Sequence, residues 1–305
     1  MPQLMPFKVG EASPANTFLA IWVAKDAGLY EANGLAVAIV PVVGGRESGP
    51  DLASGRIHLM HIGLSSVVRA NRMGGDLVAV GSLSNIIRNT LFTAPHVKGA
   101  ADLKGGIVGI SSAGSETDPT TTLALSKLGL ARDDVTIKEI GVSRLAAVRD
   151  GAVSATMLGE PSRSQALALG LTPIVDLYAD RTPWLYSGLV VHRPYLAANR
   201  DAVLRFLRGT IEGNYLAVSN APRAVKVMRR ELDLTDTAIL ETAYANFRRE
   251  TPLHAELTRE GAQNVVDIVA AGSAARIDDY IDTSLHDELE AEGFFRAMQS
   301  KYPDA

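Results

Sequence analysis

The segment from Ser112 to Thr117 joins a β-rich run, Ile107–Ser111, to a stretch that is predicted to be a helix. Free N–H groups and the positive dipole end make the start of a helix favourable for an anion, and hydroxyl groups add further donors. In the alternative interpretation the segment only caps the helix, with Ser115 or Thr117 as the N-cap. The residues that would supply donors to an anion are Ser112, Gly114, Ser115 and Thr117.

Two further loops follow predicted strands. Gly45 and Arg46 come after the run Ala36–Val43. The glycine lets the backbone approach a ligand, and the guanidinium can bind a carboxylate or sulfonate through two N–H groups. Ser13 and Asn16 follow the first predicted strand. The alternatives are a solvated or ion-paired Arg46, and a helix-capping role for Ser13 and Asn16.

Two segments of the chain repeat each other. SGRIHLMHIGLSSVVRANRMG and DGAVSATMLGEPSRSQALALG superpose without gaps, so that their glycines coincide: Gly55 with Gly151, Gly63 with Gly159, and Gly74 with Gly170. We infer two homologous α/β lobes, the first starting near residue 7 and the second near residue 88. Two lobes create a cleft, and ligands of open α/β sheets bind outside the carboxyl ends of the strands.

The repeat also singles out residues at strand exits. Glu160 stands where the other copy has Leu64, and Ser65 is a candidate hydroxyl donor one position further on. The Glu160 carboxylate either accepts a hydrogen bond from a ligand amine or hydroxyl, or forms an ion pair with Arg163 at the hinge. Trp184 is one of two tryptophans and lies on a predicted strand. It either stacks on a flat ligand or packs at the hinge.

The overall pattern is α/β with a helical tail. Roughly the first 180 residues alternate β-rich runs with amphipathic stretches, which is typical of βα units, and helices dominate from Arg193 onward. The predicted helices include Thr17–Ala32, Ser65–Met73 and Pro119–Leu128. The predicted strands are Phe7–Ala12, Ala36–Val43, His58–Leu64, Leu77–Leu83, Asn89–Thr93, Ile107–Ser111, Val135–Ile140 and Ser154–Leu158.

Composition and motifs exclude several classes of function. A net charge of −4 gives no basic face for nucleic acid, and no apolar run reaches the length of a membrane helix. The chain has no cysteine, hence no thiolate nucleophile and no Cys-based metal site. His58 and His61 have the wrong spacing to share one face of a strand. The sequence contains no Walker loop, nucleophile elbow or H-E-x-x-H motif, so we expect no metal, no cofactor and no enzymatic activity.

Four segments in order resemble a known group of proteins: FLAIWVAKDAGLYEANGLAVAIVPVVGG, LASGRIHLMHIGLSSVVRANRMGGDLVAVGSL, ADLKGGIVGISSAGSETDPTTTLALSKLGL and VRDGAVSATMLGEPSRSQALALGL. The group is that of the periplasmic substrate-binding proteins of ABC transporters, in the sulfonate/nitrate/taurine and NMT1/THI5-like branch. The resemblance covers about Phe7 to Val191. It implies a two-lobed periplasmic-binding-protein type II fold with mixed sheets, flanking helices and a helical C-terminal tail. The expected domains are residues 1–86 in lobe one, 87–186 in lobe two, and 187–305 back in lobe one.

The resemblance also implies a function. We expect a solute-binding protein that captures a small anionic organic molecule by hinge closure and delivers it to an ABC permease, acting as a monomer without membrane insertion. The alternatives are an enzyme on the same scaffold, decarboxylase-like or related to thiamine precursors, and a binder of an amino-pyrimidine held by Glu160. We expect a periplasmic or otherwise extracytoplasmic location if a leader has been removed, and a cytoplasmic one if the chain is complete.

Overall fold

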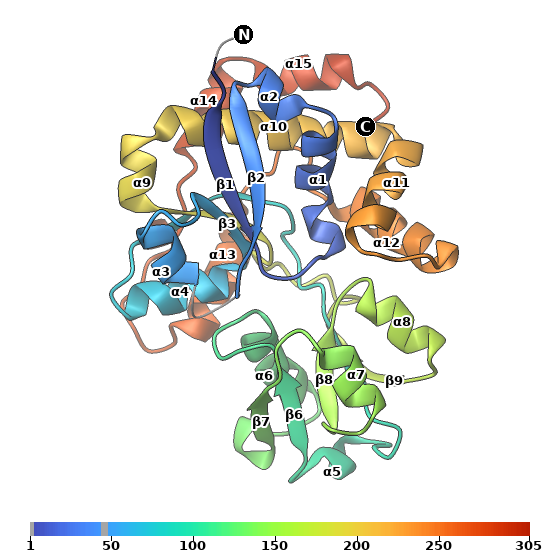
Figure 1. The fold of residues 1–305 in the computed structure, drawn as a ribbon. Coiled ribbons are helices and arrows are strands. Elements are labelled where there is room, and N and C mark those ends of the chain that lie inside the picture. Colours follow the sequence, from blue (N-terminus) through green and yellow to red (C-terminus); the bar gives the residue numbers. More distant parts are fainter. Residues whose placement is uncertain (1–2, 44–47) are drawn as a thin grey trace.

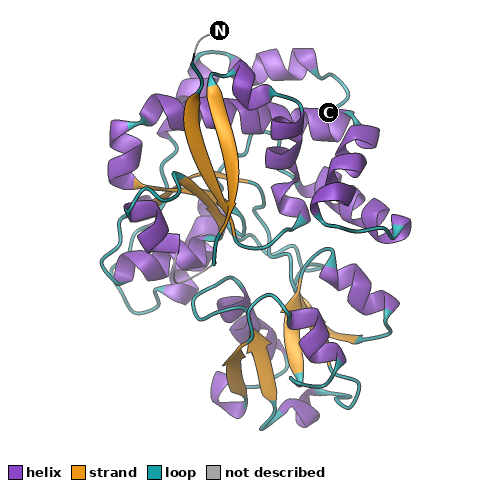
Figure 2. Ribbon diagram, viewed as in Figure 1, coloured by secondary structure: helices purple, strands orange, loops and turns teal. Residues whose placement is uncertain are grey.

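The computed structural model describes residues 3–43 and 48–305, and its strands form two separate five-stranded sheets (Figures 1 and 2). The first sheet has the order β2-β1-β3-β10-β4 and the second the order β7-β6-β8-β5-β9. We call the first sheet with its helices lobe one, and the second with its helices lobe two. The first sheet comprises β1 (Met5–Glu11), β2 (Leu35–Pro41), β3 (Leu59–Ile62), β4 (Leu77–Ser82) and β10 (Gly188–His192); the second comprises β5 (Thr90–Thr93), β6 (Ile107–Ile110), β7 (Thr136–Glu139), β8 (Ala155–Leu158) and β9 (Thr172–Asp176).

The two sheets have the same topology. In lobe one β1 runs parallel to β2 and β3, while β10 runs antiparallel to β3 and β4. In lobe two β6 runs parallel to β7 and β8, while β5 runs antiparallel to β8 and β9. The repeat identified in the sequence corresponds to β3 with its following helix and to β8 with its own. The predicted α/β fold with mixed sheets is therefore confirmed.

The chain passes between the sheets twice, in segments 83–89 and 177–187. The predicted lobe boundaries, at residues 86 and 186, fall within these two connections, and the assignment of rigid lobes stays a prediction. Two local predictions differ from the structure. The strand expected around Trp184 begins only at Gly188, and β9 was not among the predicted strands.

The helix expected over residues 17–32 is divided into three pieces: η1 (Asn16–Phe18), α1 (Leu19–Asp26) and α2 (Leu29–Ala32). Gly28, at φ 72°, lies between the last two, and a left-handed residue ends an α-helix. The remaining helices of lobe one before the tail are α3 (Ser48–Ala53) and α4 (Leu64–Arg72). Those of lobe two are α5 (Ala100–Leu103), α6 (Thr117–Lys127), η3 (Arg132–Asp134), α7 (Arg144–Arg149) and α8 (Ser162–Ala168).

The helical tail packs on lobe one (Figure 1). Phe206 of α10 stacks on Phe7 of β1 and on Tyr30 of α2, with ring centroids 5.0 and 5.1 Å apart. A β-carbon on Gly213 would overlap the backbone of α1, so this glycine lets the two helices touch. The tail consists of α9 (Arg193–Ala198), α10 (Arg200–Ser219), α11 (Ala221–Glu231), α12 (Thr237–Glu250), α13 (Arg259–Val269), η4 (Ile277–Asp279), α14 (Ser284–Ala291) and α15 (Phe294–Lys301).

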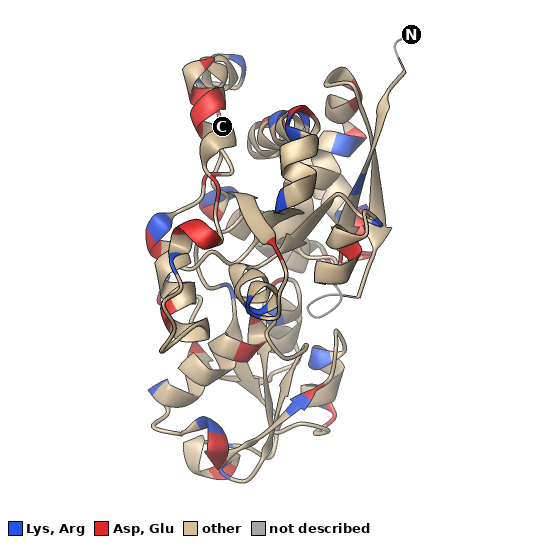
Figure 3. Cartoon of the chain, turned by 90° about the vertical axis from the view of Figure 1, so that its left-hand side faces the viewer, with Lys and Arg blue, Asp and Glu red and all other residues tan. Residues whose placement is uncertain are grey.

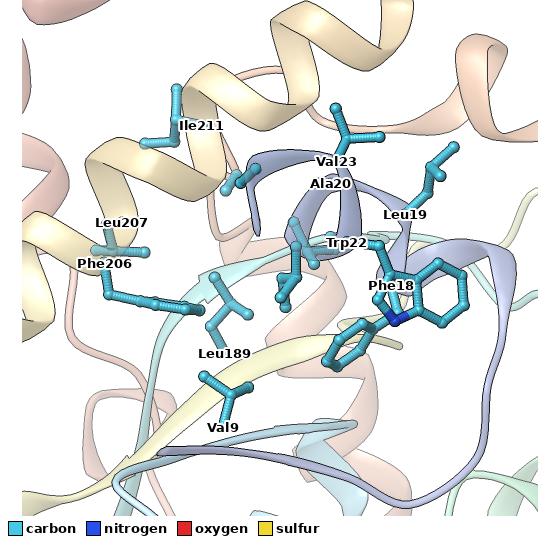
Figure 4. Close-up of a cluster of buried hydrophobic side chains, with 14 of the residues drawn as sticks. Val9, Phe18, Leu19, Ala20, Trp22, Val23, Leu189, Phe206, Leu207 and Ile211 are labelled. Atoms are coloured by element: carbon cyan, nitrogen blue, oxygen red, sulfur yellow. The ribbon is translucent and has the colours of Figure 1, made fainter. Parts of the chain in front are cut away.

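The core of lobe one fixes the loop that follows β1. Phe18 and Trp22 are buried beside Val9 and Leu189, and Figure 4 shows this cluster between the sheet and α10. Each large apolar side chain buried in this way contributes about 1.5–3 kcal/mol. Because Phe18 and Trp22 are held in the core, segment 12–17 lies in a fixed position at the end of the first sheet.

Charged residues are interspersed over the helices of both lobes rather than gathered on one lobe (Figure 3). Within the described residues, no helix combines the length and apolarity that a membrane span requires. The same residues contain no group of three or more histidine, aspartate or glutamate side chains arranged to hold a metal ion.

Candidate functional site

A cavity of about 520 Å³ lies between the two lobes. Its size is within the usual range for sites that bind small molecules. Its walls are formed by the loops that follow β1, β2 and β3 in lobe one and β6 and β7 in lobe two, together with the second connection between the lobes. The lining residues are Ala12, Ser13, Ala15, Thr17, Val42, Val43, His61, Ile62, Gly63, Ser66, Ser111, Ser112, Ser115, Glu116, Thr117, Gly141, Val142, Arg144, Tyr186 and Ser187.

The turn after β6 presents a connected set of hydroxyl groups. The Oγ of Ser111, the Oγ of Ser115 and the Oγ1 of Thr117 lie 2.8–2.9 Å from one another. The backbone N–H of Ser111 donates to Thr117 Oγ1, and Ser115 Oγ donates to the carbonyl of Ser112. Glu116, the N-cap residue of α6, forms no capping hydrogen bond with its side chain. The turn is therefore held by its own hydroxyls at the start of this helix.

Arg144 places a cation in the wall of the cavity. Its Nε donates to the carbonyl of Met157 and its Nη1 to the carbonyl of Gly141, both at 3.1 Å. These bonds fix the guanidinium, and among the described residues no carboxylate forms an ion pair with it. Burial lowers the pKa of Arg144 below its usual value, but an arginine remains charged at neutral pH. The cavity thus has a fixed positive group without a counter-ion among the residues that the structure describes.

Glu116 points out of lobe two and into lobe one. Its Oε1 accepts from the backbone N–H of Ser65 at 2.9 Å, and its Oε2 accepts from Ser65 Oγ at 3.0 Å and from Trp184 Nε1 at 2.5 Å. Although the residue is only partly buried, removal of water from its carboxylate raises its pKa to about 7, despite these hydrogen bonds, which favour the charged form. Gly63 is required here, since a β-carbon would overlap the carboxylate.

His61 is a neutral group in the lobe-one wall. Its ring lies edge-on to Phe18, with centroids 5.1 Å apart, and its Nε2 is buried without a hydrogen-bond partner. Burial lowers the pKa of His61 to about 4. With His61 neutral and Glu116 bonded to lobe one, Arg144 is the one charge that the described part of the wall offers to a ligand.

A cluster of ionic contacts joins the lobes beside the cavity. Arg88, in the first connection, forms an ion pair with Glu250 at the end of α12 at 2.9 Å, although the two groups are not aligned as a hydrogen bond. Tyr178 donates to the same carboxylate. Glu160 lies in this region, with its Oε1 3.6 Å from Arg163 and accepting from Asn246 Nδ2 at 3.3 Å. These contacts tie lobe two to the helical tail.

Comparison with known proteins identifies the family of this chain. The family model described as NMT1/THI5 like matches residues 15–224, which is more than half of the chain. The chain belongs to the NMT1/THI5-like family.

This NMT1/THI5-like chain is 28% identical over 165 residues to the riboflavin-binding protein RibY of Chloroflexus aurantiacus. That match covers 52% of this chain and 46% of RibY, so it spans about half of each. The periplasmic aliphatic sulphonate binding protein SsuA of Escherichia coli has a similar structure, with a TM-score of 0.69, 22% identity, and coverage of 88% of this chain and 91% of SsuA.

The periplasmic nitrate-binding protein NrtA of Synechocystis PCC 6803 has a TM-score of 0.75 at 15% identity, covering 95% of this chain and 89% of NrtA. At these identities the likeness shows a shared fold. The two-lobed periplasmic-binding-protein fold that the sequence predicts is therefore the fold of this NMT1/THI5-like chain.

The structure brings some of the predicted site residues together at the cavity and places others behind it. Ser13, Ser112, Ser115 and Thr117 line the cavity. Ser65 and Trp184 are fully buried behind it, where both donate to Glu116.

Gly114 adopts φ 76°, its carbonyl accepts from Ser66 Oγ, and a β-carbon on it would overlap Arg69. Asn16 donates to the carbonyl of Ala243 in α12, away from the cavity. Glu160 likewise lies in the hinge cluster, the alternative that the sequence left open. Gly45 and Arg46 fall outside the described residues.

Arg144 and His61 were not among the site residues predicted from the sequence. For Arg144 a signal was present. It lies five residues beyond the end of β7, and Arg46 lies five residues beyond the end of β2, the equivalent strand of lobe one. The ungapped repeat pairs Arg46 with Val142, so a shift of two residues at these strands is needed to pair the two arginines. For Glu116 no signal was present, because its acceptor role depends on the contact between the lobes.

Proposed function

We propose that this protein is an extracytoplasmic solute-binding protein that captures a small anionic organic molecule, of the sulfonate or carboxylate type, between its lobes and delivers it to an ABC permease. Membership of the NMT1/THI5-like family and the shared fold support the class of protein. The names of the similar proteins, which bind aliphatic sulphonate, nitrate or riboflavin, show that ligands differ within this fold. The ligand class therefore rests on the cavity itself.

The proposal of an anionic ligand rests on the position of the Arg144 guanidinium in the cavity wall. Two of its nitrogens are committed to carbonyl oxygens, so the side chain cannot turn away from the wall. Among the described residues its Nη2 has no acceptor, and a carboxylate or sulfonate oxygen supplies one. The hydroxyls of Ser111, Ser115 and Thr117 line the same cavity and can rotate toward the same acid group. A charge-assisted hydrogen bond of this kind contributes about 1.5–3 kcal/mol.

The rest of the wall fits an organic group. Val42, Val43, Ile62 and Val142 line the cavity, and residues Val43 and Val142 are 64% and 66% exposed. A ligand covering such side chains removes apolar surface from water, which is favourable at about 25 cal/mol per Å². Tyr186 is fixed by a 2.8 Å hydrogen bond from its hydroxyl to Asn89 Oδ1. These features favour an acid with an apolar body over a small inorganic anion.

The test is a thermal-shift screen followed by calorimetry. The panel contains alkanesulfonates, aliphatic and aromatic carboxylates, nitrate, amino-pyrimidines and riboflavin, and a ligand that binds only the folded state raises Tm. We expect organic acids to give the shift. Arg144→Gln should then weaken binding about tenfold or more, since one charged contact is lost. Arg149→Gln, which removes an exposed arginine of the same helix that pairs with Asp150, should leave Kd unchanged.

Two outcomes would overturn the proposal. One is a ligand from the neutral or cationic members of the panel whose affinity does not change in Arg144→Gln. The other is chemical conversion of the bound compound over hours, measured by mass spectrometry of the recovered ligand, which would favour an enzyme on this scaffold. Uptake of the identified ligand by cells with and without this protein then tests delivery to a permease.

A further inference from the structure

The contact between Glu116 and lobe one has the composition of an anion-binding site. Three donors converge on one carboxylate: the backbone N–H of Ser65, its hydroxyl, and the indole Nε1 of Trp184. Ser65 and Trp184 are both fully buried. The donors come from the first turn of α4 and from the second connection between the lobes, whereas the acceptor precedes α6 in lobe two.

The site has the shape for a carboxylate as well as the hydrogen-bond donors for one. Gly63, extended at φ −77° and ψ 161°, precedes α4 without any side-chain cap from its own segment. The Glu116 oxygens occupy the position that a capping side chain takes at other helices, where the N–H groups and the helix dipole favour negative charge. Any residue other than glycine at position 63 would fill that space.

We propose that Glu116 is an internal ligand of lobe one: its carboxylate fills an anion site formed by Gly63, Ser65 and Trp184, and thereby holds the lobes together when no solute is bound. This goes beyond solute capture, since it concerns the ligand-free protein. The lobe-one wall and the lobe-two wall of the cavity then have different roles. The lobe-one anion site is occupied by the chain itself, so the acid group of a solute is received in lobe two, at Arg144.

Beside the Glu116 contact, two other contacts join the lobes through Gly114. Ser66 Oγ donates to the carbonyl of Gly114 at 3.3 Å, and the methylene groups of Arg69 lie over Gly114. Neither contact involves an ion pair. Loss of the Glu116 carboxylate should therefore loosen this side of the closure while the Arg88–Glu250 contact on the other side remains.

The test removes the Glu116 carboxylate from the lobe-one anion site and then adds a free carboxylate in its place. Glu116→Ala leaves the three donors around a vacant space, and formate, which is a free carboxylate, is the probe. We expect the ligand-free variant to show a larger radius of gyration in small-angle scattering, a red shift in tryptophan emission and a lower Tm. Formate at tens of millimolar should raise the Tm of Glu116→Ala saturably, and chloride at the same ionic strength should not. The radius of gyration should stay large, because a free carboxylate bound to lobe one has no link to lobe two.

Two further variants keep the test decisive. Gly63→Ala retains Glu116 but fills the site, so it should resemble Glu116→Ala and show no response to formate. Glu241→Ala, which removes an exposed glutamate of α12, should behave as the wild type with or without formate. If Glu116→Ala does not fold, Gly63→Ala replaces it and should show the expanded form.

The proposal fails if the variants that fold keep the wild-type radius of gyration and tryptophan emission. It also fails if Glu116→Ala expands but formate raises its Tm no more than chloride does, because the site would then not bind a carboxylate. None of these measurements needs the solute, so their failure is separate from failure of the proposed function.

Discussion

His61 shows how a single side chain in the cavity wall makes stability depend on pH. Burial lowers its pKa from 6.5 to about 4, so the folded state favours the neutral ring. The unfolded chain binds the proton between these values and the folded chain does not. The stabilisation is therefore complete above pH 6.5 and is lost as pH falls toward 4, by up to about 3 kcal/mol.

This prediction is checked by urea unfolding at several pH values between 7 and 4. His61→Gln cannot titrate, so its stability should fall less steeply with decreasing pH than that of the wild type. His96→Gln, which replaces an exposed histidine, is the control and should follow the wild-type curve. Parallel curves for all three proteins would contradict the assignment.

At the scale of elements, the end of α12 is tied to the first connection between the lobes by a buried ion pair. The side chain of Arg88 is 4% exposed and that of Glu250 is fully buried. Arg88→Met leaves a carboxylate without its buried partner, which typically costs about 3–5 kcal/mol. Arg249 pairs with the same carboxylate but is 58% exposed, so Arg249→Met should cost less than about 1 kcal/mol. If urea unfolding shows equal losses of unfolding free energy for Arg88→Met and Arg249→Met, the buried Arg88–Glu250 pair stabilises the fold no more than the exposed Arg249–Glu250 pair.

The elements also show what the sequence could and could not predict. The alternation of β-rich and amphipathic runs located β1 to β8, since this signal is local to each run. The strand expected around Trp184 was misplaced because Trp184 and Tyr186 pack in a hydrophobic cluster of the connection between the lobes, so their burial does not come from a sheet. The turn after β6 was recognised from its serines and glycine. The bond from Glu116 to Ser65 was not, because it joins residues from two lobes whose relative position no local pattern contains.

At the scale of the whole molecule, Glu116 links the closure of the lobes to protonation. In the closed form its pKa is about 7, against 4.5 for an exposed carboxyl. Between pH 4.5 and pH 7 the closed form therefore holds a proton on Glu116 that the open form lacks. Protonation thus favours closure fully below pH 4.5, and this contribution is lost as the pH rises through 7. Tyr186 faces the same charge, and Arg144 and His61 line the same cavity.

Small-angle scattering of the ligand-free protein tests this linkage. The radius of gyration should increase between pH 5.5 and pH 8, and a saturating solute should reduce it at both values if binding closes the hinge. In Glu116→Gln the dependence on pH should be largely lost. A wild-type radius that is constant across this range, with or without solute, would exclude both the proton linkage and the hinge movement.

The arrangement of the strands has a consequence for the order in which the chain is made. In each sheet, the antiparallel strand is separated along the chain from the other four strands of that sheet. β5 follows β1 to β4 of the first sheet but belongs to the second sheet. β10 follows β6 to β9 of the second sheet but belongs to the first sheet. During translation the second sheet has all its strands once residue 176 has emerged, whereas the first still lacks β10, between β3 and β4, until residue 192. The lobe that begins first is thus completed last, and its unpaired strand edges remain open while the ribosome finishes the chain.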